Sequence, residues 1–101
     1  MIYKVHLQPL AESDLDEIYD FIAADNPERA FSFVRELREQ CEGLRRMPQR
    51  GAPREDWAKG LRVLVVKRRV TIAYLIEPDT VQILRLLYAG RDFRFPGDDG
   101  V

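Results

Sequence analysis

The chain has 101 residues, of which 46 % are hydrophobic and 33 % charged, and its formal net charge is −1. This composition is typical of a folded globular domain and excludes a disordered chain, and no apolar run reaches the roughly 20 residues of a membrane span. The N-terminus lacks the basic and apolar regions of a signal peptide, so we expect a cytoplasmic protein.

Residues 3–8 are predicted to form the first strand, because apolar and polar side chains alternate there. His6 falls on the polar side and is expected to face solvent. A helix over residues 9–24 follows, with Pro9 suited to its first turn. Six acidic residues stand between Glu12 and Asp25, mostly in the first half of this helix, where they complement the helix dipole. Its apolar stripe consists of Leu15, Ile18, Tyr19 and Ile22.

A second helix is expected from Pro27 to about Arg46, because Asn26 can cap it and proline suits its first position. The short connection predicts that the two helices form an antiparallel hairpin. Phe31 lies beside the apolar stripe of this helix, so it either closes the hairpin near its turn or is exposed to a partner. The stripe itself consists of Ala30, Phe33, Val34, Leu37, Cys41 and Leu44.

A surface loop is predicted over residues 47–59, since Pro48, Gly51 and Pro53 cannot continue a helix. Trp57 in this loop either anchors an interface or covers the core as a lid, and we expect the lid. Three strands follow, over residues 61–66, 70–76 and from residue 80 onward. A tight turn over residues 67–69 and a proline turn over residues 77–80 join them into an antiparallel meander.

The last of these strands is expected to lie inside the sheet, because it is apolar for most of its length. Strict alternation puts Val81, Ile83, Arg85 and Leu87 on one face, and Leu84, Leu86 and Tyr88 on the other. An arginine among apolar neighbours needs a partner or a wet groove. Arg85 therefore has two interpretations: it reaches the sheet edge or pairs with a carboxylate, or it lies in a concave basic site. Residues 91–95 are expected to form one helical turn.

These elements predict an α+β domain of two layers in the order β-α-α-β-β-β, with a helical hairpin on one face of a mainly antiparallel sheet. We assign residues 1–95 to this single domain and residues 96–101 to a frayed tail.

The candidate functional residues of the chain are mostly basic. Between Lys59 and Ile76 there are five basic residues and no acidic one, which favours a polyanion or an acidic partner. Glycine-rich phosphate loops are absent, and one histidine and one cysteine are too few for a zinc-type site, so we predict no metal and no cofactor. The constellation that remains consists of Arg62, Lys67, Arg69, Arg85 and Arg91, with Tyr88.

A set of short motifs in a fixed order covers nearly the whole chain. They are the Pro9–Ile22 helix pattern, Asn26-Pro27, the Pro48/Gly51/Pro53 loop, Gly60-Leu61-Arg62, and Ile83-Leu84-Arg85 running to Arg91-Asp92. In these motifs the sequence resembles the RelE/ParE superfamily of toxins from bacterial type II toxin-antitoxin operons. It is most similar to the ParE-like branch, often labelled plasmid stabilisation proteins.

The resemblance implies two different activities. ParE-like members are described as inhibitors that bind DNA gyrase and need no catalytic residue, which is the activity we expect here. RelE-like members are ribonucleases that cut messenger RNA in the ribosomal A site. For that alternative the candidate catalytic residues are Arg62, Arg69, Arg85, Tyr88 and Arg91. Tyr88 stands where several family members have a histidine, which disfavours the nuclease. A non-toxic interaction module is the third alternative.

The resemblance also implies a cognate ParD-like antitoxin with an acidic C-terminal segment, assembled with the toxin in a hetero-oligomer. An acidic amphipathic segment would meet both the basic strands and an aromatic patch. The residues that we expect to bind a partner are Phe31, Trp57, Arg62, Lys67, Arg69 and Arg85.

Overall fold

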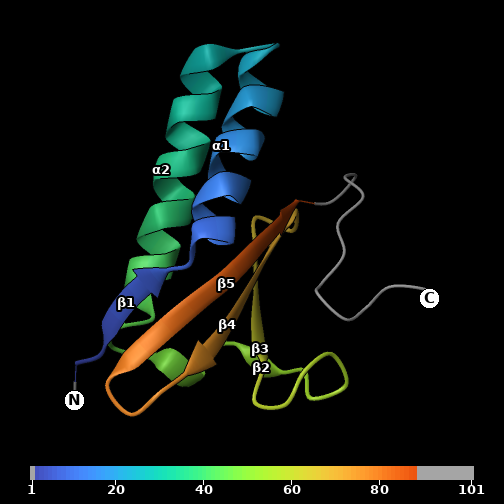
Figure 1. Ribbon diagram of the computed structural model, residues 1–101. Helices are drawn as coiled ribbons and strands as arrows, with labels where there is room; N and C mark the ends of the chain where they lie inside the picture. The colour runs from blue at the N-terminus through green and yellow to red at the C-terminus, as the bar shows by residue number, and fades with distance from the viewer. Residues whose placement is uncertain (1, 89–101) are drawn as a thin grey trace.

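The computed structural model describes residues 2–88, in which two helices pack on one face of a five-stranded mixed sheet (Figure 1). The strand order is β1-β5-β4-β3-β2, so β5 is an interior strand as expected. The elements are β1 (Lys4–Leu7), α1 (Pro9–Ala23), α2 (Pro27–Gly43), a 3₁₀ helix (Pro48–Arg50), β2 (Ala52–Pro53), β3 (Arg62–Val66), β4 (Val70–Ile76) and β5 (Thr80–Tyr88).

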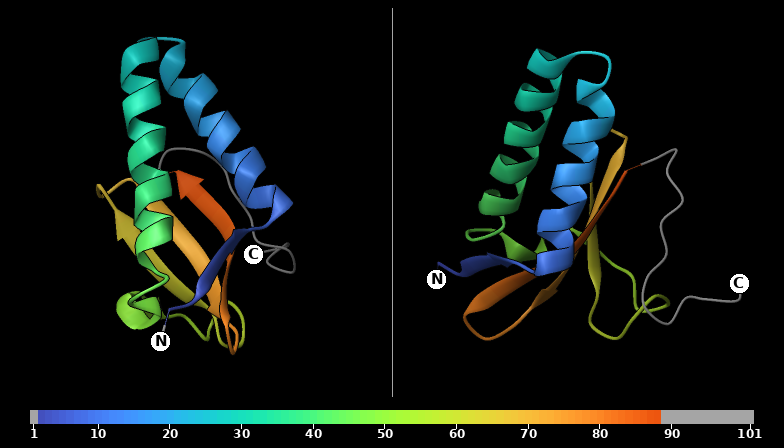
Figure 2. Two further views of the ribbon diagram at one scale, coloured as in Figure 1. Left: turned by 90° about the vertical axis from the view of Figure 1, so that its left-hand side faces the viewer. Right: turned by 45° about the horizontal axis from the view of Figure 1, so that its top comes forward.

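The helices begin where the sequence predicts. Pro9 and Pro27 occupy the first turns of α1 and α2, and the side chain of Asn26 accepts a hydrogen bond of 3.1 Å from the backbone N–H of Arg29. α2 ends at Gly43, before the expected Arg46. The connection between the helices is short, and they run antiparallel as a hairpin over the sheet (Figures 1 and 2).

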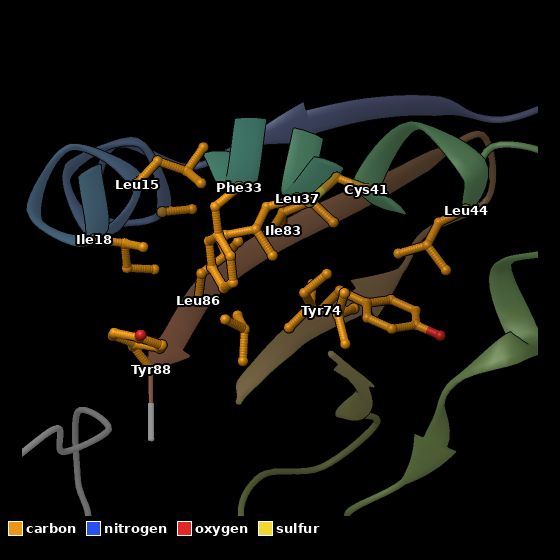
Figure 3. Packing of buried hydrophobic residues seen from close by; sticks show 14 of the residues in the cluster. Leu15, Ile18, Phe33, Leu37, Cys41, Leu44, Tyr74, Ile83, Leu86 and Tyr88 are labelled. Carbon is orange, nitrogen blue, oxygen red and sulfur yellow. The ribbon is translucent and has the colours of Figure 1, made fainter. Parts of the chain in front are cut away.

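The main core lies between the hairpin and the sheet (Figure 3). Leu15 and Ile18 of α1 and Leu37 of α2 are buried there, while Ile22 and Val34 pack at its border and remain partly exposed. These positions confirm the predicted stripes except at Tyr19, which does not join the core. The sheet contributes Ile72, Tyr74, Val81, Ile83, Leu86 and Tyr88.

The alternation predicted along β5 is wrong beyond Ile83, because Leu84 forms a β-bulge. Ala73 of β4 pairs with Arg85, whereas the next residue, Tyr74, pairs with Ile83. Leu84 is therefore an extra residue on β5. Because of it, the side chains that point to the core shift by one position after Ile83. The buried positions of β5 are, in order, Val81, Ile83, Leu86 and Tyr88.

The pairing of the strands confirms the antiparallel meander formed by β3, β4 and β5. β1 pairs with β5 in parallel, which makes the sheet mixed. β2 falls within the predicted loop and was not expected, because it has only two residues and pairs with β3 alone. β2 can pair with β3 only because the loop is held against the sheet.

Tyr74 holds that loop. Its hydroxyl donates to the carbonyl of Pro48 at 2.6 Å and accepts from the N–H of Gly51 at 2.8 Å. Burial raises the pKa of Tyr74, so the hydroxyl keeps its proton for this contact. A Cβ atom at Gly51 would lie 2.6 Å from both the Tyr74 hydroxyl and the carbonyl oxygen of Val63. Glycine is therefore required where the loop crosses this tyrosine.

Three sequence predictions fall outside the described residues: the helical turn at residues 91–95, the position of Arg91 and the tail at residues 96–101. The domain boundary at residue 95 stays a prediction. Within residues 2–88, neither helix combines the length and the apolar character that crossing a membrane would require.

Candidate functional site

Arg85 forms an ion pair with Asp14 of α1. Its Nε donates to Oδ2 at 2.7 Å and its Nη2 donates to Oδ1 at 2.9 Å. The backbone N–H of Leu86 also donates to Oδ2, at 2.9 Å, and the carboxylate is only 1 % exposed. The hydrogen bond to Asp14 raises the pKa of Arg85, so the guanidinium stays charged. Of the two alternatives for Arg85, the structure therefore shows the pairing with a carboxylate.

Arg62 and Tyr88 also have structural contacts. The Nη1 atom of Arg62 donates to the carbonyls of Gly51 at 2.6 Å and Gln49 at 3.3 Å, which ties β3 to the loop before β2. Tyr88 is 7 % exposed and lies beside the other core residues (Figure 3). Its ring centroid lies 5.7 Å from that of Phe21 and 5.9 Å from that of Phe33. Tyr88 is thus part of the core.

Trp57 lies in the segment between β2 and β3 and is 40 % exposed. The guanidinium of Arg54 stands 4.1 Å from the centroid of its ring, and the same guanidinium donates to both carboxylate oxygens of Asp56. The hydrogen bond from Arg54 lowers the pKa of Asp56. Trp57 is not among the buried core residues or the hydrophobic residues packed against them, so our expectation of a lid is wrong. The surface loop forms its own local packing instead.

Phe31 is 62 % exposed and lines a shallow groove of about 220 Å³ on the helical hairpin. The groove, which we call the hairpin groove, is lined by Tyr19, Phe31, Val34, Arg35 and Arg38. The guanidinium of Arg35 lies 5.9 Å from the centroid of the Phe31 ring. Of the two alternatives for Phe31, the structure shows the exposed one.

Lys67 and Arg69 meet α2 at a second concavity, of about 190 Å³. This turn cavity is lined by Arg29, Phe33, Glu36, Lys67 and Arg69. The Nζ atom of Lys67 lies 2.8 Å from a carboxylate oxygen of Glu36 and 5.5 Å from the centroid of the Phe33 ring. Cationic side chains from the β3–β4 turn and from α2 thus gather at one place.

The predicted partner-binding residues therefore do not form one surface. Lys67 and Arg69 share the turn cavity, whereas Phe31 lies in the hairpin groove. The segment that carries Trp57 is at the opposite end of the molecule from the connection between α1 and α2 (Figure 1). Arg62 binds backbone carbonyls of the loop before β2, and Arg85 pairs with Asp14, so both side chains have structural contacts.

Sequence reasoning missed the residues of α2 that complete these two concavities. Arg29, Phe33 and Glu36 are spaced i, i+4 and i+7, which already places them on one face of a helix. That this face meets the β3–β4 turn follows only from the tertiary structure. Among the described residues, no group of three or more histidine, cysteine, aspartate or glutamate side chains is arranged to hold a metal ion.

Comparison with known proteins identifies the family. The model of the family described as "ParE toxin of type II toxin-antitoxin system, parDE" matches residues 5–93. The match places the chain among the toxins of type II toxin-antitoxin systems. Within that class, the chain belongs to the ParE toxin family, which confirms the resemblance seen in the sequence.

Two solved structures share the fold. A chain of the chromosomal ParDE TA system from P. aeruginosa is 28 % identical, with a TM-score of 0.75, and the match covers 86 % of this chain and 96 % of that one. The conserved hypothetical protein HP0894 from Helicobacter pylori is 25 % identical, with a TM-score of 0.57, and the match covers 92 % and 100 % of the two chains. A comparison with curated proteins found no match.

Proposed function

We propose that this ParE-family toxin arrests bacterial growth by binding DNA gyrase, and that it uses no catalytic residue of its own. The observation that carries this proposal is that two of the candidate nuclease residues, Arg85 and Tyr88, have structural contacts. Arg85 is held by the buried Asp14, and Tyr88 lies in the core with its ring near those of Phe21 and Phe33. General acid–base catalysis needs a group within hydrogen-bonding reach of its substrate. These contacts favour a protein that acts by binding.

Expression in a bacterial host tests the proposal against both alternatives. Gyrase inhibition predicts growth arrest with induction of the DNA-damage response. Arrest with cleavage of messenger RNA at defined sites would point to the RelE-like nuclease, and the absence of arrest to a non-toxic module. Tyr88→Phe sharpens the comparison, because a core tyrosine is expected to tolerate loss of its hydroxyl, whereas removal of a catalytic group typically costs about 100-fold or more in rate.

We further propose that a ParD-like antitoxin neutralises the toxin through an amphipathic acidic segment seated in the hairpin groove. Phe31, Tyr19 and Val34 supply an apolar surface, and Arg35 and Arg38 border it with positive charge. A helix or extended segment with alternating apolar and acidic residues matches this surface. Assembly of the toxin and this antitoxin into a hetero-oligomer is part of the proposal.

Binding kinetics of the antitoxin encoded beside this gene test that second step. Phe31→Ala is expected to raise the dissociation rate about 30-fold, the effect of a central aromatic anchor. Neutralising Arg35 is expected to lower the association rate and its salt dependence instead. Met47→Ala is the matched control, because Met47 is 63 % exposed and does not line the groove. Equal rates for Phe31→Ala and Met47→Ala would exclude the groove as the docking site.

A further inference from the structure

The turn that joins β3 to β4 has an unusual backbone for its residues. Lys67 and Arg68 have φ angles of 55° and 60°, and the N–H of Arg69 donates to the carbonyl of Val66 at 3.1 Å. These signs of φ are those of a type I′ turn, in which Asn-Gly or Gly-Gly is strongly preferred. A Cβ atom is disfavoured at positive φ, because it crowds the neighbouring carbonyl oxygen. The backbone of the turn therefore does not favour these two cations, and only Lys67 has a compensating contact, with Glu36 of α2.

Arg29 is a second residue in a place that the fold does not favour. It lies in the first turn of α2, where its backbone N–H is bound by the cap residue Asn26. The positive end of the helix dipole disfavours a cationic side chain in this turn. The side chain of Arg29 nevertheless lines the same turn cavity as Lys67 and Arg69. Of the two strained turn residues only Lys67 lines this cavity, so one cation from the turn and one from the first turn of α2 converge there despite placements that are unfavourable for folding.

Among the residues that the structure describes, the charges in the turn cavity are only partly compensated. Glu36 pairs with Lys67 at 2.8 Å. Among residues 2–88, no carboxylate is found within ion-pair distance of Arg29 or Arg69. The single apolar side chain of the cavity, Phe33, is 6 % exposed and offers little surface. The cavity therefore presents positive charge, and its one hydrophobic side chain is largely covered.

We propose that the turn cavity binds phosphodiester groups of a nucleic-acid backbone. Guanidinium groups match the geometry of phosphate oxygens, so Arg29 and Arg69 are suited to hold them, while Lys67 adds a point charge that Glu36 keeps in position. Affinity for nucleic acid comes largely from phosphate contacts, whereas protein partners are anchored by buried apolar side chains. The cavity has the cations for the first kind of partner, while its one hydrophobic side chain, Phe33, is too buried to anchor the second.

This inference extends the proposed function, because gyrase acts while it holds DNA, but the binding itself does not require gyrase. Contacts to phosphate carry no sequence information, so the site would position the toxin along a backbone rather than select a sequence. DNA and RNA share this chemistry, and the experiment separates them. A toxin that arrests growth by gyrase binding yet fails to bind nucleic acid would contradict this inference alone.

The experiment measures binding of the full chain to a fluorescently labelled DNA duplex and to an RNA duplex of the same sequence, over a series of salt concentrations. Each neutralised phosphate makes the slope of log K against log salt more negative by about 0.9. Three cations that each neutralise one phosphate therefore predict a slope near −2.7 for the preferred duplex. Arg29→Gln and Arg69→Gln are each expected to reduce the slope by about 0.9. Arg45→Gln is the matched control, since Arg45 follows the same helix with a half-exposed side chain and lies outside the cavity.

A second variant tests the strain argument and guards against loss of folding. Lys67→Asn combined with Arg68→Gly gives the turn the residues that its backbone prefers, so the melting temperature is expected to rise by about 4 °C or more. The same variant is expected to lose at least about 0.9 of the salt slope. A more stable protein that binds nucleic acid less well is the result that the proposal predicts.

Three results would overturn the proposal. The first is an unchanged salt slope in Arg29→Gln and Arg69→Gln. The second is an equal loss in the Arg45→Gln control, which would show that the charge acts diffusely. The third is slower association with the acidic antitoxin in Arg29→Gln or Arg69→Gln while nucleic-acid binding stays intact. That result would assign the cavity to a protein partner.

Discussion

Removal of the Asp14 carboxylate is the substitution that we expect to disturb the fold most strongly. β1 ends its pairing with β5 at Ile83, and beyond that point α1 approaches β5 and Asp14 accepts three hydrogen bonds from it. Asp14→Ala leaves the charge of Arg85 and the N–H of Leu86 without this partner. Removing one member of a buried ion pair costs about 3–5 kcal/mol, and an unsatisfied buried N–H costs about 1–3 kcal/mol.

The two costs overlap, because the side chain of Arg85 is 12 % exposed and can turn toward water. We therefore expect Asp14→Ala to lower the free energy of unfolding by about 3–5 kcal/mol, a large share of the roughly 5–15 kcal/mol typical of a domain. Urea denaturation followed by circular dichroism measures the loss. Asp14→Asn is expected to lose less, because its amide oxygen can still accept from Leu86.

Glu12→Ala is the matched control on the same helix. Glu12 also pairs with an arginine, Arg38, at 2.9 Å, but both side chains are about half exposed. Such a pair contributes at most about 1 kcal/mol. If Asp14→Ala lost no more stability than Glu12→Ala, the buried hydrogen bonds from β5 to Asp14 would not have the stabilising effect that we assign to them.

Three further predictions concern the core and the loop before β2. Leu37→Ala should cost about 2–5 kcal/mol because Leu37 is fully buried, while Val65→Ala, at 61 % exposed, should cost less than about 1 kcal/mol in the same urea titration. Gly51→Ala should lower the melting temperature, because its Cβ atom would lie 2.6 Å from two oxygen atoms; an unchanged value would contradict the tight crossing. Burial raises the pKa of the Cys41 thiol from 9.0 to about 12, so the folded protein favours the neutral thiol. The stabilisation that follows from this preference is fully present below pH 9.0 and is lost as the pH rises toward 12. Stability should fall more steeply over that window in the native sequence than in Cys41→Ala.

The parts of the fold that local chemistry decides could be predicted from the sequence. Pro9, Asn26 and Pro27 determine where the helices begin, through effects confined to a single turn. The apolar stripe of α2 follows from helical periodicity, and its members Leu37 and Cys41 are fully buried. The antiparallel meander followed for the same reason, since its turns are short.

The parts that depend on distant pairing could not be predicted. The bulge at Leu84 changes which side of β5 faces the core, and no residue near it in the sequence signals the extra position. Asp14 stands in a run of acidic residues on α1, yet it is buried because it meets Arg85, a partner from the other end of the chain. The basic candidates divide among separate places for the same reason. Charge and periodicity identify them, but only the fold decides their neighbours.

A cleavage assay with purified gyrase and plasmid DNA tests the central claim most directly. The claim that this ParE-family toxin acts on gyrase predicts that the toxin raises the amount of cleaved DNA recovered after protein denaturation, and that the antitoxin encoded beside its gene abolishes the effect. Unchanged cleavage by gyrase, together with cutting of messenger RNA by the same toxin preparation in a translating extract, would contradict the claim.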